Sequence, residues 1–408
     1  MLHKNQQNTH RQYTTSLTIV LKVGTSSICN EETHFPLLSN LSALVESVLE
    51  LKSQGHRVVL VTSAAVGTGL RRLNMPSKPS KLSARQAVAA VGQGRLMALY
   101  DDLFGQFHQP VAQILLTKND LADRSQYLNA VNCLEELLDM GVVPIVNEND
   151  TISTQGIRFG DNDTLSAVMA GMIKADYLFL LTDVDCLYTD NPRTNPEAKP
   201  VKVCKDMVKL RAQVSVASMG SSLGTGGMAT KLIAAELATA AGVTTIITNG
   251  SKPANIAKII RTDRNSDKEY TEDHPLHTRF IAKNNPLIDR KWWIQYGLHT
   301  AGTIFVDEGA AKAILTPQLK SSLFAAGIVE VDGQFGAQQA VHIAVRVKNE
   351  QTGILEDKVI GKGLVNYTNI EISRIKRCHS TQIPDILGYV DADCVIHRDN
   401  LVRFTDQL

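Results

Sequence analysis

Two lysines lie in sequence contexts where an ammonium group could face a phosphate. Lys22 stands near the end of the apolar segment Leu17–Val23, just before the loop Gly24–Ser27. A buried lysine needs a partner, and the loop N–H groups would add donors for an anion, although a strand-end lysine can also reach solvent. Lys231 ends the glycine-rich stretch Gly220–Lys231, where a following helix would present its N-terminus to the same anion. The Walker A order is absent.

A second candidate is the stretch Asn147–Asp163, which carries short polar side chains at both ends. Asn147–Asp150 reads Asn-Glu-Asn-Asp, and Asp161–Asp163 reads Asp-Asn-Asp. The stretch follows the apolar segment Val142–Val146 and precedes Thr164–Lys174, which has helical spacing. It could bind a polar amino acid, or it could cap turns and the next helix.

Alternating strands and helices position these residues. The pattern predicts an α/β fold with a mainly parallel central sheet and right-handed crossovers, whose ligands bind beyond the carboxyl ends of the strands. The small residues of Ser63–Gly69 would let a ligand approach the backbone closely. The predicted strands are Leu17–Val23, Arg57–Thr62, Val111–Thr117, Val142–Val146, Tyr177–Thr182 and Thr244–Thr248, and the predicted helices are Pro36–Gln54, Ser83–Phe107, Ser125–Met140, Thr164–Lys174 and Leu232–Ala241.

Composition excludes several classes of protein. The 408 residues carry 42 basic and 41 acidic side chains, a net charge of +1, which argues against a general binder of nucleic acid or membrane surfaces. No apolar run approaches the roughly 18–20 residues of a membrane span. The six cysteines form no C-x-x-C pair, as expected for reduced thiols in a cytoplasmic protein. Residues 1–16 are polar, lack the apolar core of a signal peptide, and are expected to be disordered.

The last part of the chain has a different character. Residues 263–290 are charged and turn-rich, which predicts a linker or a surface excursion. Residues 291–408 resemble a PUA domain, a small β-rich module also found in RNA-modifying enzymes. The basic stretch Arg374–Arg377 leaves RNA binding open, but the neutral overall charge favours a solvated surface. The strands expected here are Thr303–Val306, Gly327–Val331, Ala340–Val347, Val359–Leu364 and Cys394–Ile396.

Residues 17–262 resemble the amino-acid kinase family, because a set of its motifs occurs in order. Two positions depart from the family pattern: Ala64 and Cys186 stand where many members have glycine. The matching motifs are Lys22-Val-Gly-Thr-Ser, Val61-Thr-Ser63, Asn147-Glu-Asn-Asp150, Gly160-Asp-Asn-Asp163, Thr182-Asp183, Leu187-Tyr-Thr-Asp-Asn-Pro-Arg193 and Gly224-Thr-Gly-Gly-Met-Ala-Thr-Lys231.

The pairing of these motifs with a PUA-like tail resembles the members that phosphorylate the γ-carboxylate of free L-glutamate, the first step of proline biosynthesis. The resemblance implies ATP and Mg²⁺ as cofactors, proline as a feedback inhibitor and a homo-oligomer. It assigns catalysis to Lys22, Lys231 and Asp163, with Asp163 orienting the two lysines. It assigns glutamate binding to Ser63, Asp150, Asn162 and Asn147, and nucleotide binding to Lys22, Thr182, Asp183, Thr225, Gly226, Gly227, Met228, Ala229, Thr230 and Lys231. No residue is assigned to the metal, which usually rides on phosphates and water.

The chemistry of that substrate determines what the site must do. A carboxylate with a reference pKa of about 4.3 is already ionised at neutral pH, so no general base is required. The barrier is the approach of an anion to a polyanion, and positive charge and positioning should lower it. Because the kinase motifs end before Ile260, truncation near Asp289 is expected to preserve activity.

Other functions stay open on the sequence alone. N-acetylglutamate kinase, aspartokinase and uridylate kinase share the core motifs. An RNA-binding or RNA-modifying protein would use the PUA-like end, but it would leave both lysine loops unexplained. The loops could also be ordinary turns, although several motifs in order argue against this.

Overall fold

The computed structural model describes residues 16–30, 32–117, 120–121, 123–152, 162–190, 192, 195–207, 209–210, 227–263, 274–283, 289–316, 321–348, 355–389 and 392–404. The expected tail, except Ser16, and two expected nucleotide-binding residues, Thr225 and Gly226, lie outside these residues. Among the helices described, none is long and apolar enough to cross a membrane.

The first domain is built on an eight-stranded sheet with the order β3-β4-β2-β1-β5-β9-β10-β8. All neighbouring pairs are parallel except β9 and β10, which are antiparallel. This confirms the predicted α/β fold with a mainly parallel sheet. The strands are β1 (Thr18–Val23), β2 (Arg57–Thr62), β3 (Val111–Leu116), β4 (Val143–Glu148), β5 (Tyr177–Thr182), β8 (Val203–Cys204), β9 (Thr244–Asn249) and β10 (Thr278–Phe280), and a separate two-stranded sheet pairs β6 (Leu187–Tyr188) with β7 (Pro200–Val201).

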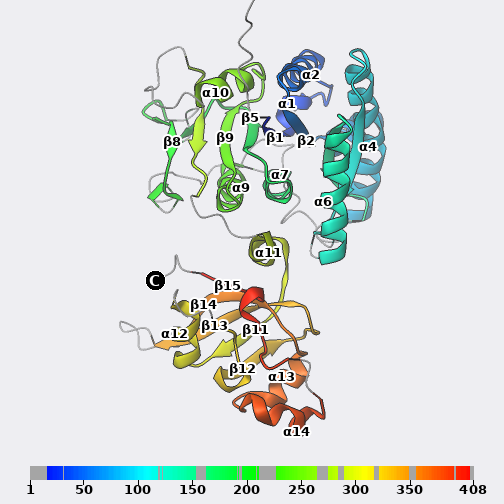
Figure 1. The fold of residues 1–408 in the computed structure, drawn as a ribbon. Helices are drawn as coiled ribbons and strands as arrows, with labels where there is room; N and C mark the ends of the chain where they lie inside the picture. Colours follow the sequence, from blue (N-terminus) through cyan, green and yellow to red (C-terminus); the bar gives the residue numbers. More distant parts are fainter. Residues whose placement is uncertain are drawn as a thin grey trace, which may run out of the picture.

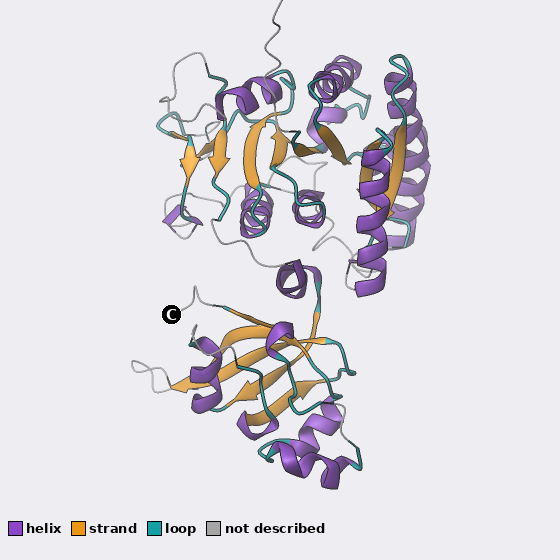
Figure 2. Cartoon of the chain, in the orientation of Figure 1, coloured by secondary structure: helices purple, strands orange, loops and turns teal. Residues whose placement is uncertain are grey.

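Helices cover both faces of this sheet (Figure 2). Side chains alternate along a strand, so Ile19 and Leu21 pack into one apolar core and Val20 into the other. Lys22 continues the series of Val20 and therefore points to the second face. The first core includes side chains from α2 (Leu38–Ser53), α4 (Leu82–Gly105) and α10 (Asn255–Asp263), and the second includes side chains from α6 (Arg124–Asp139), α7 (Asn162–Met172) and α9 (Met228–Ala240).

The small residues after β2 form a helix rather than an open loop. After the turn that holds Ser63, α3 (Ala65–Arg72) packs against α4 at backbone distance. A Cβ added to Gly69 would lie 1.9 Å from the Val88 carbonyl oxygen, and one added to Gly92 would lie 1.8 Å from that of Ala65. We expected the small residues to let a ligand approach the backbone, but at Gly69 the close approach is to the neighbouring helix. The short helix α1 (Thr25–Ile28) follows β1 in the same way.

The second domain contains a five-stranded sheet with the order β12-β11-β13-β14-β15 (Figure 1). The prediction of a strand at Cys394–Ile396 is wrong, because Ile396 makes only an isolated bridge with Leu323. Val395 and Ile396 are apolar because they are fully buried, not because they belong to the sheet. The elements are β11 (Thr300–Val306), α12 (Glu308–Leu315), β12 (Ile328–Gly333), β13 (Ala340–Lys348), β14 (Leu355–Leu364), α13 (Asn369–Ile375), α14 (Ile383–Leu387) and β15 (Leu401–Arg403).

The segment between the domains is more integrated than a linker. Its described residues include β10, which joins the kinase-side sheet, and Phe280, which is buried there. The short helix α11 (Asp289–Trp292) then runs into a π-helical turn, η1 (Trp293–Gly297), between the two domains (Figure 1). We did not expect a strand here from the sequence, since three residues among charged and turn-forming neighbours give no periodic signal.

Candidate active site

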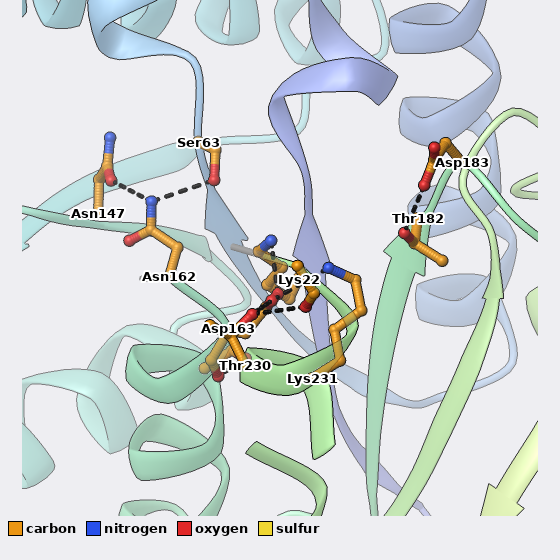
Figure 3. A network of polar contacts seen from close by, with 11 residues as sticks. Lys22, Ser63, Asn147, Asn162, Asp163, Thr182, Asp183, Thr230 and Lys231 are labelled. Carbon is orange, nitrogen blue, oxygen red and sulfur yellow. Dashed lines mark hydrogen bonds and ion pairs between the residues drawn. The ribbon is translucent and has the colours of Figure 1, made fainter. Parts of the chain in front are cut away.

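A buried carboxylate between two ammonium groups forms the centre of the site (Figure 3). The Lys22 Nζ lies 2.5 Å from one oxygen of Asp163, and the Lys231 Nζ lies 3.1 Å from the other. Lys22 comes from β1, Asp163 from the first turn of α7, and Lys231 from the first turns of α9. The Asp163 side chain is fully buried, and both lysines are nearly so. The structure thus brings together the three predicted catalytic residues.

The charges of this triad determine the protonation of Asp163. Burial by itself would raise the pKa of the Asp163 carboxyl, but the ammonium groups of Lys22 and Lys231 outweigh it and hold the pKa well below its usual range. The carboxylate therefore stays ionised, and it reduces the mutual repulsion of two cations that share a small volume.

The N-terminus of α9 faces the same centre. Its first residue follows Gly227, which has no side chain to cap the helix, so the first backbone N–H groups of the helix can donate to a ligand. The Thr230 hydroxyl lies 2.9 Å from an Asp163 oxygen and 2.7 Å from the Gly227 carbonyl oxygen, and it can donate to either. The predicted residues Gly227, Met228 and Ala229 form the start of this helix.

A second polar group lies on the β2–β4 side of Lys22. The Asn162 amide nitrogen donates to the Ser63 hydroxyl at 3.1 Å and to the Asn147 side-chain oxygen at 3.0 Å (Figure 3). Asn147 is buried, and its amide nitrogen donates to Gln93 on α4 at 2.8 Å. The Asn162 side-chain oxygen is buried and has no hydrogen-bond partner among the residues described. It is an acceptor available to a ligand donor.

Asp150 follows that hydrogen-bonded group in the chain, three residues beyond Asn147. Burial raises the pKa of its carboxyl, and the nearby Lys78 ammonium acts in the opposite direction. The side chain is half-buried, and no hydrogen bond holds it within the residues that the structure describes. Asp150 is thus a carboxylate that a cationic group of a ligand could approach.

The remaining predicted residues lie across Lys22 from the polar group. Thr182 ends β5 and donates its hydroxyl to the Asp183 carboxylate at 3.0 Å (Figure 3). In the sheet β1 stands between β2 and β5. Lys22 therefore separates two halves: Ser63 and Asn147 on one side, and Thr182 and Asp183 on the other.

Comparison with known proteins gives a consistent result over most of the chain. Residues 17–249 match the amino acid kinase family, and residues 302–387 match the PUA domain. The probable glutamate 5-kinase of Schizosaccharomyces pombe is 54% identical over 97% of this chain and 94% of its own length. The glutamate 5-kinases of Rippkaea orientalis and Nostoc punctiforme are 48% and 49% identical over 94% of this chain, and over 98% and 99% of their own lengths. The chain belongs to the amino acid kinase family.

Solved structures give a weaker match to this amino acid kinase. The carbamate kinase of Giardia lamblia bound to AMP-PNP is 16% identical, with a TM-score of 0.48, over 66% of this chain and 99% of that one. A similarity this low gives no information on the substrate or the mechanism of this chain.

One departure from the family pattern has a structural consequence in this kinase. Ala64, where many members have glycine, adopts φ +77°, a left-handed conformation that is costly for a residue with a Cβ. It lies between Ser63 and the start of α3, so the turn that presents Ser63 stores some strain here.

Sequence reasoning missed two residues of the site. Gln93 lies within α4, and its contact with Asn147 had no local signal because the two are far apart in sequence. Lys78 lies between two prolines in a connection, a context that predicts only a turn. For the metal, no group of three or more His, Cys, Asp or Glu side chains in the described part of the chain could hold an ion.

Proposed function

We propose that this protein is a glutamate 5-kinase, which transfers the γ-phosphoryl group of ATP to the γ-carboxylate of L-glutamate in the first step of proline biosynthesis. The observation that carries the proposal is the buried Lys22–Asp163–Lys231 triad, which lies between the hydrogen-bonded polar group around Asn162 and the carboxyl ends of β5 and β9. The names of relatives at about half identity, matched over nearly their full lengths, support the same substrate.

The transfer needs charge more than it needs a base. A γ-carboxylate oxygen attacks the γ-phosphorus of ATP, the bond to the β,γ-bridging oxygen breaks, and ADP leaves with that electron pair. The attacking carboxylate is ionised at neutral pH, since its reference pKa is about 4.3. No proton has to be removed from it. What must be overcome is repulsion between the carboxylate and the phosphates, and the charge that develops on the transferred group.

Lys22 and Lys231 supply that positive charge from two directions. Their ammonium groups are fixed by Asp163 before ligands arrive, so little reorganisation is needed in the transition state. Both are nearly buried, where their electrostatic effect is larger than in water. Asp163 is a positioning residue, because both of its oxygens are directed to lysines.

Glutamate is held on the β2–β4 side. The Asn162 side-chain oxygen, which has no partner among the described residues, and the Asp150 carboxylate are acceptors for the α-ammonium group, and the Ser63 hydroxyl is a donor or acceptor for the same ligand. Asn147 was expected to contact substrate. Its oxygen accepts from Asn162 and from the Glu148 backbone N–H, and its nitrogen donates to Gln93. We therefore assign Asn147 the task of orienting Asn162.

ATP fits the opposite half of the site. Thr182 and Asp183 stand at the carboxyl end of β5, and the uncapped N-terminus of α9 with Lys231 suits a phosphate. Thr225 and Gly226 stay predictions, since they lie outside the described residues. Mg²⁺ would shield the phosphate charge while held mainly by phosphate oxygens and water.

A coupled ADP-release assay with glutamate, N-acetylglutamate, aspartate and UMP tests the assignment. Hydroxylamine should trap the acyl phosphate as a hydroxamate when glutamate is the substrate. If glutamate yields no hydroxamate while another compound supports turnover, the assignment is wrong.

Proline is proposed as an inhibitor that occupies part of the glutamate site. It carries an α-carboxylate and a ring ammonium but no γ-carboxylate, so it should raise the apparent KM for glutamate more than that for ATP. Inhibition that saturating glutamate leaves unchanged would indicate a separate site. Homo-oligomer formation, a cytoplasmic location and the absence of RNA binding by the PUA domain stay predictions.

A further inference from the structure

Arg85 carries a polar atom that the fold leaves unsatisfied. It lies in the first turns of α4, and its guanidinium Nε is buried without a hydrogen-bond partner among the residues that the structure describes. A buried donor on a charged group is costly when nothing accepts from it. Such an atom is expected to gain an acceptor when the site is occupied.

The position of α4 places Arg85 beyond the strand ends, on the side where glutamate is proposed to bind. Gln93 on this helix contacts Asn147 at the end of β4. Arg85 is eight residues earlier and therefore on a similar face, about 12 Å further along the axis. α3 and α4 run antiparallel, with Ala65 beside Gly92 and Gly69 beside Val88. Because helical side chains lean toward the helix N-terminus, the Arg85 side chain extends further beyond the strand ends.

The surroundings of Arg85 favour an anion. Lys78 is close enough to both Arg85 and Asp150 to feel their charges: burial lowers the pKa of Lys78, Asp150 raises it and Arg85 lowers it further. Two cations near one half-buried carboxylate leave an excess of positive charge. The N-terminus of α4 also has no side-chain cap, because Lys81 precedes it, and its dipole adds positive potential at this point.

We propose that Arg85, assisted by Lys78, binds the α-carboxylate of glutamate, while Asp150 binds the α-ammonium group. The inference rests on the proposed function and defines its amino-acid end. A free amino acid presents adjacent positive and negative groups. The cluster presents a carboxylate next to two cations, the complementary arrangement. An arginine also suits a carboxylate because its N–H groups can donate in pairs.

The test removes the charge on both sides of the proposed contact. Arg85→Gln and wild type are assayed with glutamate and with isoglutamine, in which the α-carboxylate is an amide and the γ-carboxylate is intact. Wild type should prefer glutamate strongly. In Arg85→Gln we expect kcat/KM for glutamate to fall about 10- to 100-fold, the effect of one hydrogen bond to a charged group, with KM for ATP unchanged. The preference over isoglutamine should fall by a similar factor. Arg85→Lys should recover part of it.

Arg95→Gln is the matched control, because Arg95 lies on the same helix and is exposed. It should behave as wild type with both substrates. If Arg85→Gln and Lys78→Gln both retain the wild-type preference for glutamate over isoglutamine, the proposal is wrong, whatever happens to total activity. If Arg85→Gln does not fold, Lys78→Gln alone tests the proposal, again by the ratio of kcat/KM for glutamate to kcat/KM for isoglutamine. Failure of the proposed function is separate, since wild type would then give no hydroxamate from glutamate.

Discussion

At the scale of single residues, the chemistry depends on one carboxylate that no ligand needs to touch. Lys22 and Lys231 are held by Asp163 at 2.5 and 3.1 Å. Removing one lysine takes away a charge contact to the transferring phosphoryl group. We expect Lys22→Ala or Lys231→Ala to lower kcat about 10²- to 10³-fold, the usual size for such a loss. Steady-state kinetics measure this, and a loss below about tenfold for both would contradict the charge-stabilisation mechanism.

Asp163 also links stability to pH. Its pKa in the folded protein is lowered from 3.8, so the ionised carboxylate stabilises the fold above that value, and this stabilisation is lost as pH falls below it toward the folded pKa. Asp163→Asn should lower the free energy of unfolding at pH 7 by about 3–5 kcal/mol, the cost of leaving buried charges unpaired. Urea titrations at pH 7 and pH 3 should show a smaller difference between wild type and variant at pH 3. An equal difference at both pH values would contradict this.

The half-buried carboxylate of Asp150 leads to a kinetic prediction. Asp150→Asn retains the shape and removes the charge. If the side chain binds the α-ammonium of glutamate, the change should weaken glutamate use by about 1.5–3 kcal/mol, the range for hydrogen bonds to charged groups. KM for ATP should stay the same. If Asp150 only caps a turn, asparagine would serve nearly as well, and an unchanged glutamate KM and kcat would refute the binding role.

At the scale of elements, α7 packs closely against a tryptophan from outside the kinase sheet. A Cβ added to Gly171 on α7 would lie 2.7 Å from the Trp292 ring. Gly171→Ala should therefore shift the helix that carries Asp163 and lower the free energy of unfolding by about 1–3 kcal/mol, with a fall in kcat. Gly94→Ala on α4 is the control, because nothing lies within 4 Å of its added Cβ. This change should stabilise the protein by about 0.4–1 kcal/mol. Similar melting temperatures for the two variants would contradict the contact.

At the scale of the whole molecule, the two domains meet through residues that belong to the kinase core. The Trp292 indole N–H donates to the Leu237 carbonyl on α9 at 3.2 Å, and that of Trp293 donates to the Leu121 carbonyl at 2.9 Å. On the opposite side, Lys362 of β14 donates to the carbonyls of Gln295 and Leu298. The domains are thus joined by packing and hydrogen bonds and not by a tether alone.

This junction changes the expected outcome of truncation. A chain ending at Asp289 loses both tryptophans, whose side chains are buried in the kinase core. We now expect it to be poorly folded, since loss of one buried tryptophan costs about 3–5 kcal/mol. A chain ending at Leu298 retains them and should keep glutamate-dependent ADP release. Thermal melting followed by circular dichroism compares the two. Equal melting temperatures for the two truncated chains would instead support a domain boundary near Asp289, as expected from the sequence.

The sequence by itself determined much of this protein because its strands are continuous apolar runs and its motifs are local. The bounds of β2 and β5 were predicted to the residue, since each is a buried strand with an abrupt polar end. Motifs that can be recognised along the sequence identified Lys22, Asp163 and Lys231. The short apolar segment Cys394–Ile396 gave a wrong strand prediction, because buried positions have the same residue types whether or not they pair in a strand.

Only the tertiary structure decided which of these residues meet. Asp163 and Lys231 are 68 positions apart in the chain, and their contact exists because α7 and α9 pack on the same sheet face as Lys22. The Gln93–Asn147 hydrogen bond and the burial of Trp292 likewise depend on how helices pack across the sheet, as does the Nε of Arg85, which has no partner among the described residues. Local pattern determines which face of an element is apolar. It does not determine which polar atoms are left opposite one another, because that follows from the relative positions of whole elements.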